Sequence, residues 1–171
     1  VKAATHGVDL GPMVPRLAEV LRTTNGRLLL TPPYITRDLP RLAARLERPA
    51  EDLVLISRRH LRSNNSWMHN VPVLVKGKDR CTLLVHPDDA ARYRVTDGAM
   101  AMVSSEAGTI EVPVEVTEDI MRGVVSMPHG WGHDRPGTRN AVAREHAGVN
   151  TNVLSPGTFI DEISNNAAVN G

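Results

Sequence analysis

The stretch TIEVPVEV, residues 109–116, decides the fold class. Apolar residues occupy every second position, which is the pattern of a β-strand with one buried face. Pro113 interrupts the polar positions and has no amide hydrogen, so we expect this strand at a sheet edge or at a bulge. The segment Ala99–Ser104 and the glycine-containing turn at 106–108 precede it. Together these segments predict a β-hairpin.

Further strands are predicted on both sides of this hairpin. Leu53–Ile56 and Cys81–Val85 are continuous apolar runs, as in strands buried on both faces. His86-Pro-Asp-Asp resembles a helix start with acidic residues in the first turn. Residues 123–127 predict another strand, and the part after residue 128 is irregular. The pattern therefore favours a mainly β domain with short helices.

The first fifty residues have a different composition. They hold six of the twelve prolines, at positions 12, 15, 32, 33, 40 and 49. This density argues against a strand-rich core there. Short helices are expected after Pro15 and after Asp38, and a short strand at Arg27–Leu30. We interpret residues 1–50 as a linker or strap from an upstream part of a longer protein, and residues 51–171 as the main domain.

Composition excludes several classes of protein. A chain of 171 residues is one domain's worth. A net charge of +1 does not suggest the clustered basic face expected of a protein that binds nucleic acid. The sequence has no apolar run of about 20 residues, so no membrane span is predicted. The single cysteine, Cys81, excludes an internal disulfide and a cysteine-rich metal site, and is expected to be an inert core thiol.

The chain begins at Val1 without an initiator methionine or a basic and apolar leader. We therefore expect an excised fragment, with trimming of a few residues as the alternative. We separately expect a cytoplasmic location.

The stretch SRRHLRSNNSWMHN, residues 57–70, follows the first predicted strand and could bind a ligand. Arginine suits phosphate or the edge of a heterocycle, asparagine and serine both donate and accept, and tryptophan offers a stacking face. Loops that follow strands often carry binding residues. A solvated loop anchored by one tryptophan is the alternative interpretation.

Two later stretches have a similar polar character. PHGWGH, residues 128–133, has glycines that permit close backbone approach to a ligand. His129 and His133 are four residues apart, but the glycines make a helix, and hence a zinc pair, unfavourable. GVNTNVLS, residues 148–155, predicts a short extended segment with amides on one face. A tight turn and a loop rich in Asx turns are the respective alternatives.

Taken in order, the four motifs resemble one family. They are the strand followed by Ser-Arg-Arg and Asn-Ser-Trp, the stretch from His86-Pro-Asp-Asp to Val-Thr-Asp-Gly98, the Pro-His-Gly-Trp-Gly-His turn, and the late Asn-x-Asn-Val-Leu. This order is similar to the C-terminal molybdopterin dinucleotide-binding domain of the dimethyl sulfoxide reductase family, which includes formate dehydrogenases and nitrate reductases. The resemblance covers about residues 50–171. It implies a six-stranded double-psi β-barrel over residues 51–171 with an irregular C-terminal tail.

The resemblance also implies a ligand and its contacts. The expected cofactor is a molybdopterin guanine dinucleotide carrying molybdenum or tungsten, and the protein's role is to bind and position it. The cofactor-binding residues carried over are Arg58, Leu61, Asn64, Ser66, Trp67, His129, Gly130, Trp131, and Asn150 or Asn152. No catalytic residue and no metal ligand is expected in this chain, because the cofactor supplies sulfur to the metal. Iron–sulfur clusters, if any, belong to other domains of the parent.

The resemblance implies that the partners are the remaining domains of a larger oxidoreductase, with formate dehydrogenase as one example. The chain alone is then expected to be inactive. The alternative is a freestanding double-psi barrel that acts as a substrate- or peptide-recognition module. A decarboxylase of that fold would mature by cleavage at a Gly-Ser bond, and the sequence contains no such pair.

Overall fold

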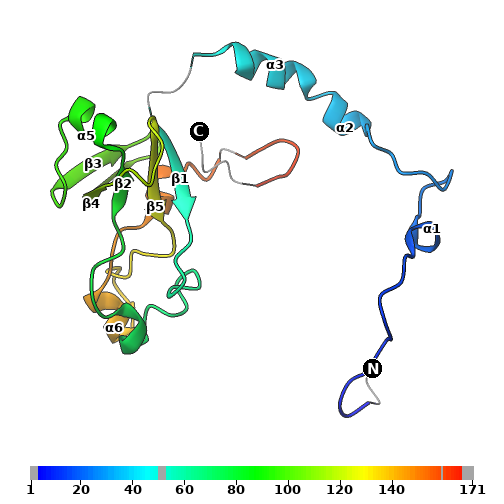
Figure 1. Ribbon diagram of the computed structural model, residues 1–171, viewed down its shortest axis with the longest axis horizontal. Coiled ribbons are helices and arrows are strands. Elements are labelled where there is room, and N and C mark those ends of the chain that lie inside the picture. Colours follow the sequence, from blue (N-terminus) through cyan, green and yellow to red (C-terminus); the bar gives the residue numbers. More distant parts are fainter. Residues whose placement is uncertain (1–3, 50–52, 159, 167–171) are drawn as a thin grey trace. The chain divides into compact units, whose positions relative to one another are not determined.

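The computed structural model describes residues 4–49, 53–158 and 160–166 (Figure 1). The chain divides into two units, an N-terminal unit of residues 1–47 and a C-terminal unit of residues 48–171.

The N-terminal unit contains three short helices, α1 (Leu17–Val20), α2 (Pro33–Thr36) and α3 (Leu39–Glu47). The helices predicted after Pro15 and Asp38 are confirmed. The strand predicted at 27–30 is wrong, because Arg27 and Leu30 lie in bends and the two residues between them form no ladder. Helix α3 has Leu39, Leu42 and Leu46 at positions that share one face, and all three are exposed. Within the described part of this unit no residue is buried, so it has no core of its own.

The C-terminal unit is built on a mixed sheet. Its strands are β1 (Val54–Arg58), β2 (Leu83–Val85), β3 (Met100–Ser104), β4 (Thr109–Val116) and β5 (Val124–Pro128). Their order across the sheet is β1-β5-β2-β4-β3. Strands β1 and β5 are parallel, as are β2 and β4, whereas β2 and β5, and β3 and β4, are antiparallel.

The predicted hairpin is confirmed as β3 and β4, in register from Met100 opposite Pro113 to Ser104 opposite Thr109. The alternation along β4 is also confirmed, because Ile110, Val112 and Val114 are buried. The expected edge position is wrong for the strand as a whole, since β4 lies between β2 and β3. Its residues 109–113 pair with β3 and its residues 114–116 pair with β2, so Pro113 itself has a ladder partner on one side only.

The core lies mainly on one face of this sheet. Its buried members are Leu83, Val85, Ala90, Ile110, Val112, Val114, Val125, Met127 and Leu154. Seven of them come from the neighbouring strands β5, β2 and β4. Along β2 and β4 they alternate with less buried positions, so the period-two pattern of the sequence selects the buried face there. As expected, Cys81 is buried, and its sulfur accepts a hydrogen bond from the Val149 amide at 3.2 Å.

Short helices complete the unit. They are α4 (Pro72–Val75), α5 (Pro87–Tyr93), α6 (Ala141–Glu145) and the 3-10 helix η1 (Thr151–Leu154). The predicted start of α5 is confirmed, because the His86 side chain accepts from the Asp88 amide at 3.2 Å. The architecture is therefore mixed α/β with a five-stranded mixed sheet, which is broader than the mainly β class expected. No helix in the described ranges is long and apolar enough to cross a bilayer.

Candidate functional site

The candidate site forms where β1 and β5 end. The two strands are parallel and in register from Val54 and Val124 to Arg58 and Pro128, so their carboxyl ends meet at the same edge of the sheet. The loop of residues 59–71 leaves one strand, and the turn of residues 129–134 leaves the other. Figure 1 shows the loops and α4 and α6 on this side of the sheet. In sheets with parallel strands, ligands commonly bind outside the carboxyl ends of the strands.

Glycines bring the predicted motifs into contact. A Cβ at Gly130 would lie 2.7 Å from the carbonyl carbon and oxygen of Asn65, and one at Gly132 would lie 2.6 Å from the Cβ of Asn150. A Cβ at Gly148 would lie 2.8 Å from the Trp131 ring. Real Cβ atoms do not approach so closely, so each position requires glycine. The three stretches singled out in the sequence therefore converge around the 129–134 turn.

His129 is the centre of a polar cluster at this junction. Its Nδ1 lies 3.1 Å from the Ser57 hydroxyl, and its Nε2 lies 2.5 Å from Arg59 Nη1 and 2.8 Å from Asn65 Oδ1. Arg59 Nη1 also donates to Asn65 Oδ1. The cluster thus joins strand β1, the following loop and the turn after β5.

His129 Nε2 faces a donor and an acceptor at once. The Arg59 guanidinium can only donate and Asn65 Oδ1 can only accept, so a lone pair on Nε2 suits Arg59 and a proton on Nε2 suits Asn65. Burial and the charge of Arg59 lower the pKa of His129 below its ordinary value. His129 is therefore neutral near pH 7.

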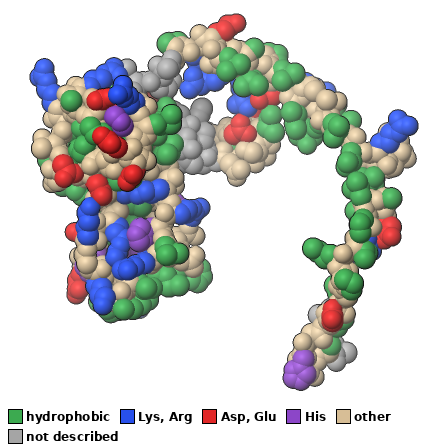
Figure 2. Space-filling view, viewed as in Figure 1, with side chains coloured by type: hydrophobic (Ala, Val, Ile, Leu, Met, Phe, Trp, Pro, Cys, Tyr) green, Lys and Arg blue, Asp and Glu red, His purple; other side chains and the backbone are tan. Residues whose placement is uncertain are grey.

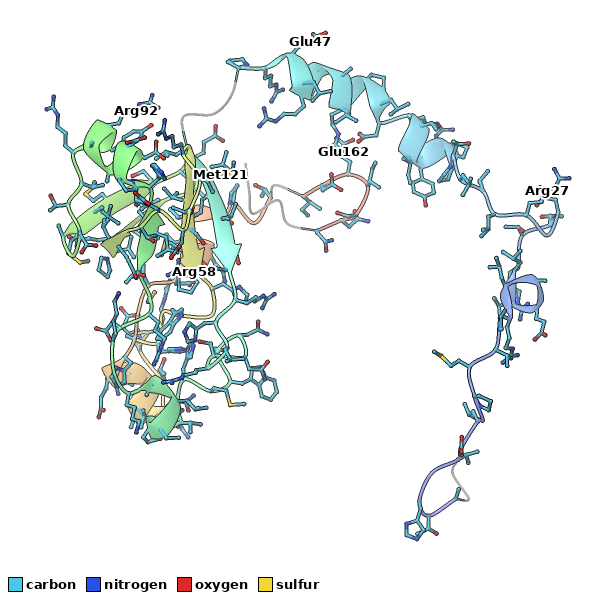
Figure 3. All side chains as sticks on the ribbon, in the orientation of Figure 1. Arg27, Glu47, Arg58, Arg92, Met121 and Glu162 are labelled. Atoms are coloured by element: carbon cyan, nitrogen blue, oxygen red, sulfur yellow. The ribbon has the colours of Figure 1, made fainter. Side chains whose placement is uncertain are left out.

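Arg58 faces the sheet. Its guanidinium donates to the carbonyl of Ser126, and to the carbonyl and hydroxyl of Thr82 at 2.8 and 3.0 Å. Figure 3 shows Arg58 at the place where the strands give way to the loops. Most of its donors are thus used by the protein itself, and burial lowers its pKa.

Several predicted residues are presented to solvent. Leu61 is 98% exposed and Trp67 is 80% exposed, and Asn64 and Ser66 are exposed in the same loop. Asn64 has a positive φ of 41°, a conformation that asparagine tolerates better than most residues. An exposed leucine and tryptophan beside polar side chains give this loop a surface that could pack against a flat ligand or another domain.

The remaining predicted residues have structural contacts. Trp131 is buried and stacks on His69, with ring centroids 3.9 Å apart. Asn150 precedes η1 and its side-chain oxygen accepts from the Asn152 amide at 3.0 Å, while Asn152 is exposed. The interpretation of 128–133 as a tight turn with a packed tryptophan therefore holds beside any binding role. Within the described ranges no three His, Cys, Asp or Glu side chains are grouped so as to hold a metal.

Sequence reasoning did not select Ser57, Arg59, Asn65, His69 or His133 as site residues. All five lie inside the two quoted stretches, but their pairing depends on the parallel register of β1 on β5. That register places Ser57 opposite Met127, two residues before His129. Strand pairing between segments about 70 residues apart was the missing signal.

The loop segment and the strand segment of this unit carry opposite net charges. Residues 57–80 hold six Lys and Arg and one acidic residue, whereas residues 83–128 hold three basic and eight acidic residues. Lys, Arg and His side chains gather over the loop half of this unit on the face shown in Figure 2. The near-zero net charge of the whole chain hides this local positive region, which would attract an anionic ligand.

Comparison with protein families identifies this unit. The family described as "Molydopterin dinucleotide binding domain" matches residues 53–171. The chain belongs to the molybdopterin dinucleotide-binding domain family. This is the domain of the dimethyl sulfoxide reductase family that the sequence motifs resembled, and that resemblance is confirmed.

Two curated relatives match shorter parts of the chain. A dimethyl sulfoxide/trimethylamine N-oxide reductase of Rhodobacter capsulatus is 38% identical over 69 residues, which are 37% of this chain and 8% of that protein. A trimethylamine-N-oxide reductase of Haemophilus influenzae is 34% identical over 56 residues, 33% of this chain and 7% of that protein. The chain thus matches less than a tenth of the length of either relative.

A solved structure supports the fold. Acetylene hydratase from Pelobacter acetylenicus superposes with a TM-score of 0.58 and 19% identity, covering 80% of this chain and 18% of that one. At this identity the likeness concerns the fold alone.

Proposed function

We propose that the C-terminal unit binds a molybdopterin guanine dinucleotide at the junction of the 59–71 loop and the 129–134 turn. The observation that carries the proposal is the polar cluster of Arg59, Asn65 and His129 at the parallel ends of β1 and β5. It lies within a segment that belongs to a molybdopterin dinucleotide-binding family.

The residues present fit such a ligand. A dinucleotide carries a pyrophosphate, and the positive 57–80 segment supplies arginines that pair with phosphate oxygens. The pterin and guanine offer flat edges with donors and acceptors, which suit the side chains of Asn64, Ser66 and His129. Gly130 lets the backbone approach closely, as its packing on Asn65 shows. Arg59 is better placed than Arg58 to contact the ligand, because the Arg58 guanidinium binds the sheet backbone.

In this proposal the chain is a cofactor-binding part of a larger molybdenum or tungsten oxidoreductase. When bound, the cofactor supplies dithiolene sulfur to the metal and carries the redox chemistry. The chain's own residues bind the dinucleotide, orient it and hold His129 neutral as an acceptor. Any iron–sulfur cluster would belong to other domains.

The finer architecture belongs to the same proposal. Closure of the five-stranded sheet into a six-stranded double-psi barrel, and the role of residues 1–50 as a strap to the remaining domains, stay predictions. Formate dehydrogenase specificity has no support, because both curated relatives are named as reductases of oxides. The cytoplasmic location also stays a prediction.

The test is titration of the chain with guanosine diphosphate (GDP), followed by the indole NMR signals of Trp67 and Trp131. We expect saturable shifts of both signals and weaker binding of adenosine diphosphate. Arg59→Gln should weaken GDP binding about tenfold to a hundredfold, since hydrogen bonds to charged groups are worth about 1.5–3 kcal/mol. Arg122→Gln is the matched control, because Arg122 pairs with Asp88 beside α5. Silence of both signals together with binding of peptides would overturn the proposal in favour of a recognition module.

A further inference from the structure

Two histidines from the two loops meet inside the C-terminal unit. His69 ends the loop after β1 and is 1% exposed, while His133 belongs to the turn after β5 and is half-buried. Their Nδ1 and Nε2 atoms, in that order, are 2.7 Å apart, and the ring centroids are 5.0 Å apart in an edge-on arrangement. None of the polar contacts described for the His129 cluster involves this pair.

The geometry allows one proton between the two rings. Two N–H groups facing each other at 2.7 Å would repel, and so would two lone pairs. One imidazole must therefore donate and the other accept. A second proton would place two positive rings in contact at a buried position, which is costly.

The pair is packed against the tryptophan that shapes the turn. His69 stacks on Trp131, and the Trp131 ring in turn covers Gly148 next to Cys81. Neither His69 Nε2 nor Trp131 Nε1 has a hydrogen-bond partner among the described residues. The hydrogen bond to His133 is therefore the side-chain hydrogen bond that orients the His69 ring, and the stack transmits that orientation to Trp131.

We propose that His69 and His133 are positioning residues that share a single proton and thereby hold the 129–134 turn against the 59–71 loop. The inference rests on the proposed function, because these are the two segments that would bind the dinucleotide. Neither ring needs to touch the ligand. The pair fixes the distance between Asn64 and Ser66 on one side and His129 on the other.

The surroundings favour the state with one shared proton. Burial, the ring of His133 and the nearby His60 lower the pKa of His69 to about 4, while the Gly130 carbonyl acts in the opposite direction. Burial lowers the pKa of His133, and the adjacent Asp134 raises it. Burial first, and then the charges of Arg80, Arg62 and Arg58, lower the pKa of His60, so His60 is neutral near pH 7 and adds no positive charge to the pair there.

The direct test is the ring nitrogen NMR spectrum of the full chain between pH 8 and pH 4. We expect one protonated and one unprotonated nitrogen at His69 Nδ1 and His133 Nε2 at pH 6. Two protonated nitrogens at pH 6, or two rings that titrate independently near pH 6.5, would overturn the shared proton.

Variants separate the hydrogen bond from the ring stack. His69→Phe keeps a ring against Trp131 and removes the shared proton, so we expect the Trp131 indole signal to move and GDP affinity to fall about tenfold, the value of one buried hydrogen bond. His133→Gln keeps a polar group near the position of Nε2 and should retain most of the wild-type affinity for GDP. His6→Phe should change neither readout.

The outcomes distinguish this inference from the proposed function. If the wild-type chain binds no GDP but His69→Phe still displaces the Trp131 signal and the amide signals of Asn64 and Ser66, the proposed function fails and the positioning role stands. If GDP binds and His69→Phe changes neither the signals nor the affinity, the positioning role is wrong. Should His69→Phe fail to fold, His133→Phe provides the same comparison from the half-buried side.

Discussion

Replacing Gly130 by alanine tests the close approach on which the site depends. Gly130 and Gly137 have the same φ of +89°, and a Cβ at Gly137 would meet nothing within 4 Å. A Cβ at Gly130 would lie 2.7 Å from the Asn65 carbonyl and 3.1 Å from the Ser66 amide nitrogen. The two substitutions share the backbone strain of a positive φ and differ in the steric clash. Gly137→Ala is therefore a matched control.

The magnitudes follow from these two contributions. A left-handed backbone costs an L-residue about 1–2 kcal/mol, so Gly137→Ala should lower the free energy of unfolding by that amount. Forcing an extra methyl into a packed contact adds about 1–3 kcal/mol, which brings Gly130→Ala to about 2–5 kcal/mol. The backbone of Asn65 and Ser66 cannot move aside as a flexible side chain would.

The assay is urea denaturation of the full chain followed by circular dichroism, with the m-value as a check that the unfolded states are alike. The reasoning is refuted if both variants lose the same free energy of unfolding. Equal losses would mean that the 129–134 turn does not pack on the 59–71 loop, and the candidate site would not exist in this form.

Three further predictions concern other contacts. Met127→Ala should lower the free energy of unfolding by about 2–5 kcal/mol, because Met127 is fully buried. Met121→Ala, at a position 71% exposed, should change it by no more than about 0.5 kcal/mol. Equal urea midpoints for the two variants would contradict this core. Arg58→Met should lower the free energy of unfolding by about 1–3 kcal/mol, because it leaves the Ser126 and Thr82 carbonyls without the guanidinium donor. Arg59→Gln should weaken GDP binding with little loss of stability. If thermal unfolding and GDP titration instead show that Arg58→Met loses binding and Arg59→Gln loses stability, Arg58 is the ligand contact. The pKa of His69 is lowered to about 4 in the folded state, so below pH 6.5 the unfolded chain binds more protons than the folded chain. The contribution of His69 to the free energy of unfolding should therefore be full above pH 6.5 and fall by up to about 3 kcal/mol toward pH 4. This loss should be absent in His69→Phe.

The strands were predictable because each carries its own pattern. The alternation in residues 109–116 selects the buried face of β4, and the apolar runs locate β1 and β2 to within two residues. The position of β4 was not predictable from Pro113 alone. A proline excludes a hydrogen bond at one residue, and here that residue precedes the pairing of β4 with β2.

The site was predictable as segments and not as contacts. Composition alone drew attention to 57–70, 128–133 and 148–155, and the structure brings all three together. It could not show that Arg58 binds the sheet while Arg59 faces His129, because that choice depends on the alternation of side chains along β1 and its register on β5. The pairing of His69 with His133 likewise joins residues 64 positions apart.

The central claim is that this chain holds a molybdopterin guanine dinucleotide within a larger metal enzyme. The most direct measurement is the metal and nucleotide content of the native protein that contains this sequence, purified with an antibody against the C-terminal unit. We predict a polypeptide several times longer than this chain that carries molybdenum or tungsten and releases guanine nucleotide on acid hydrolysis. A native polypeptide of this length with neither metal nor guanine would contradict the account.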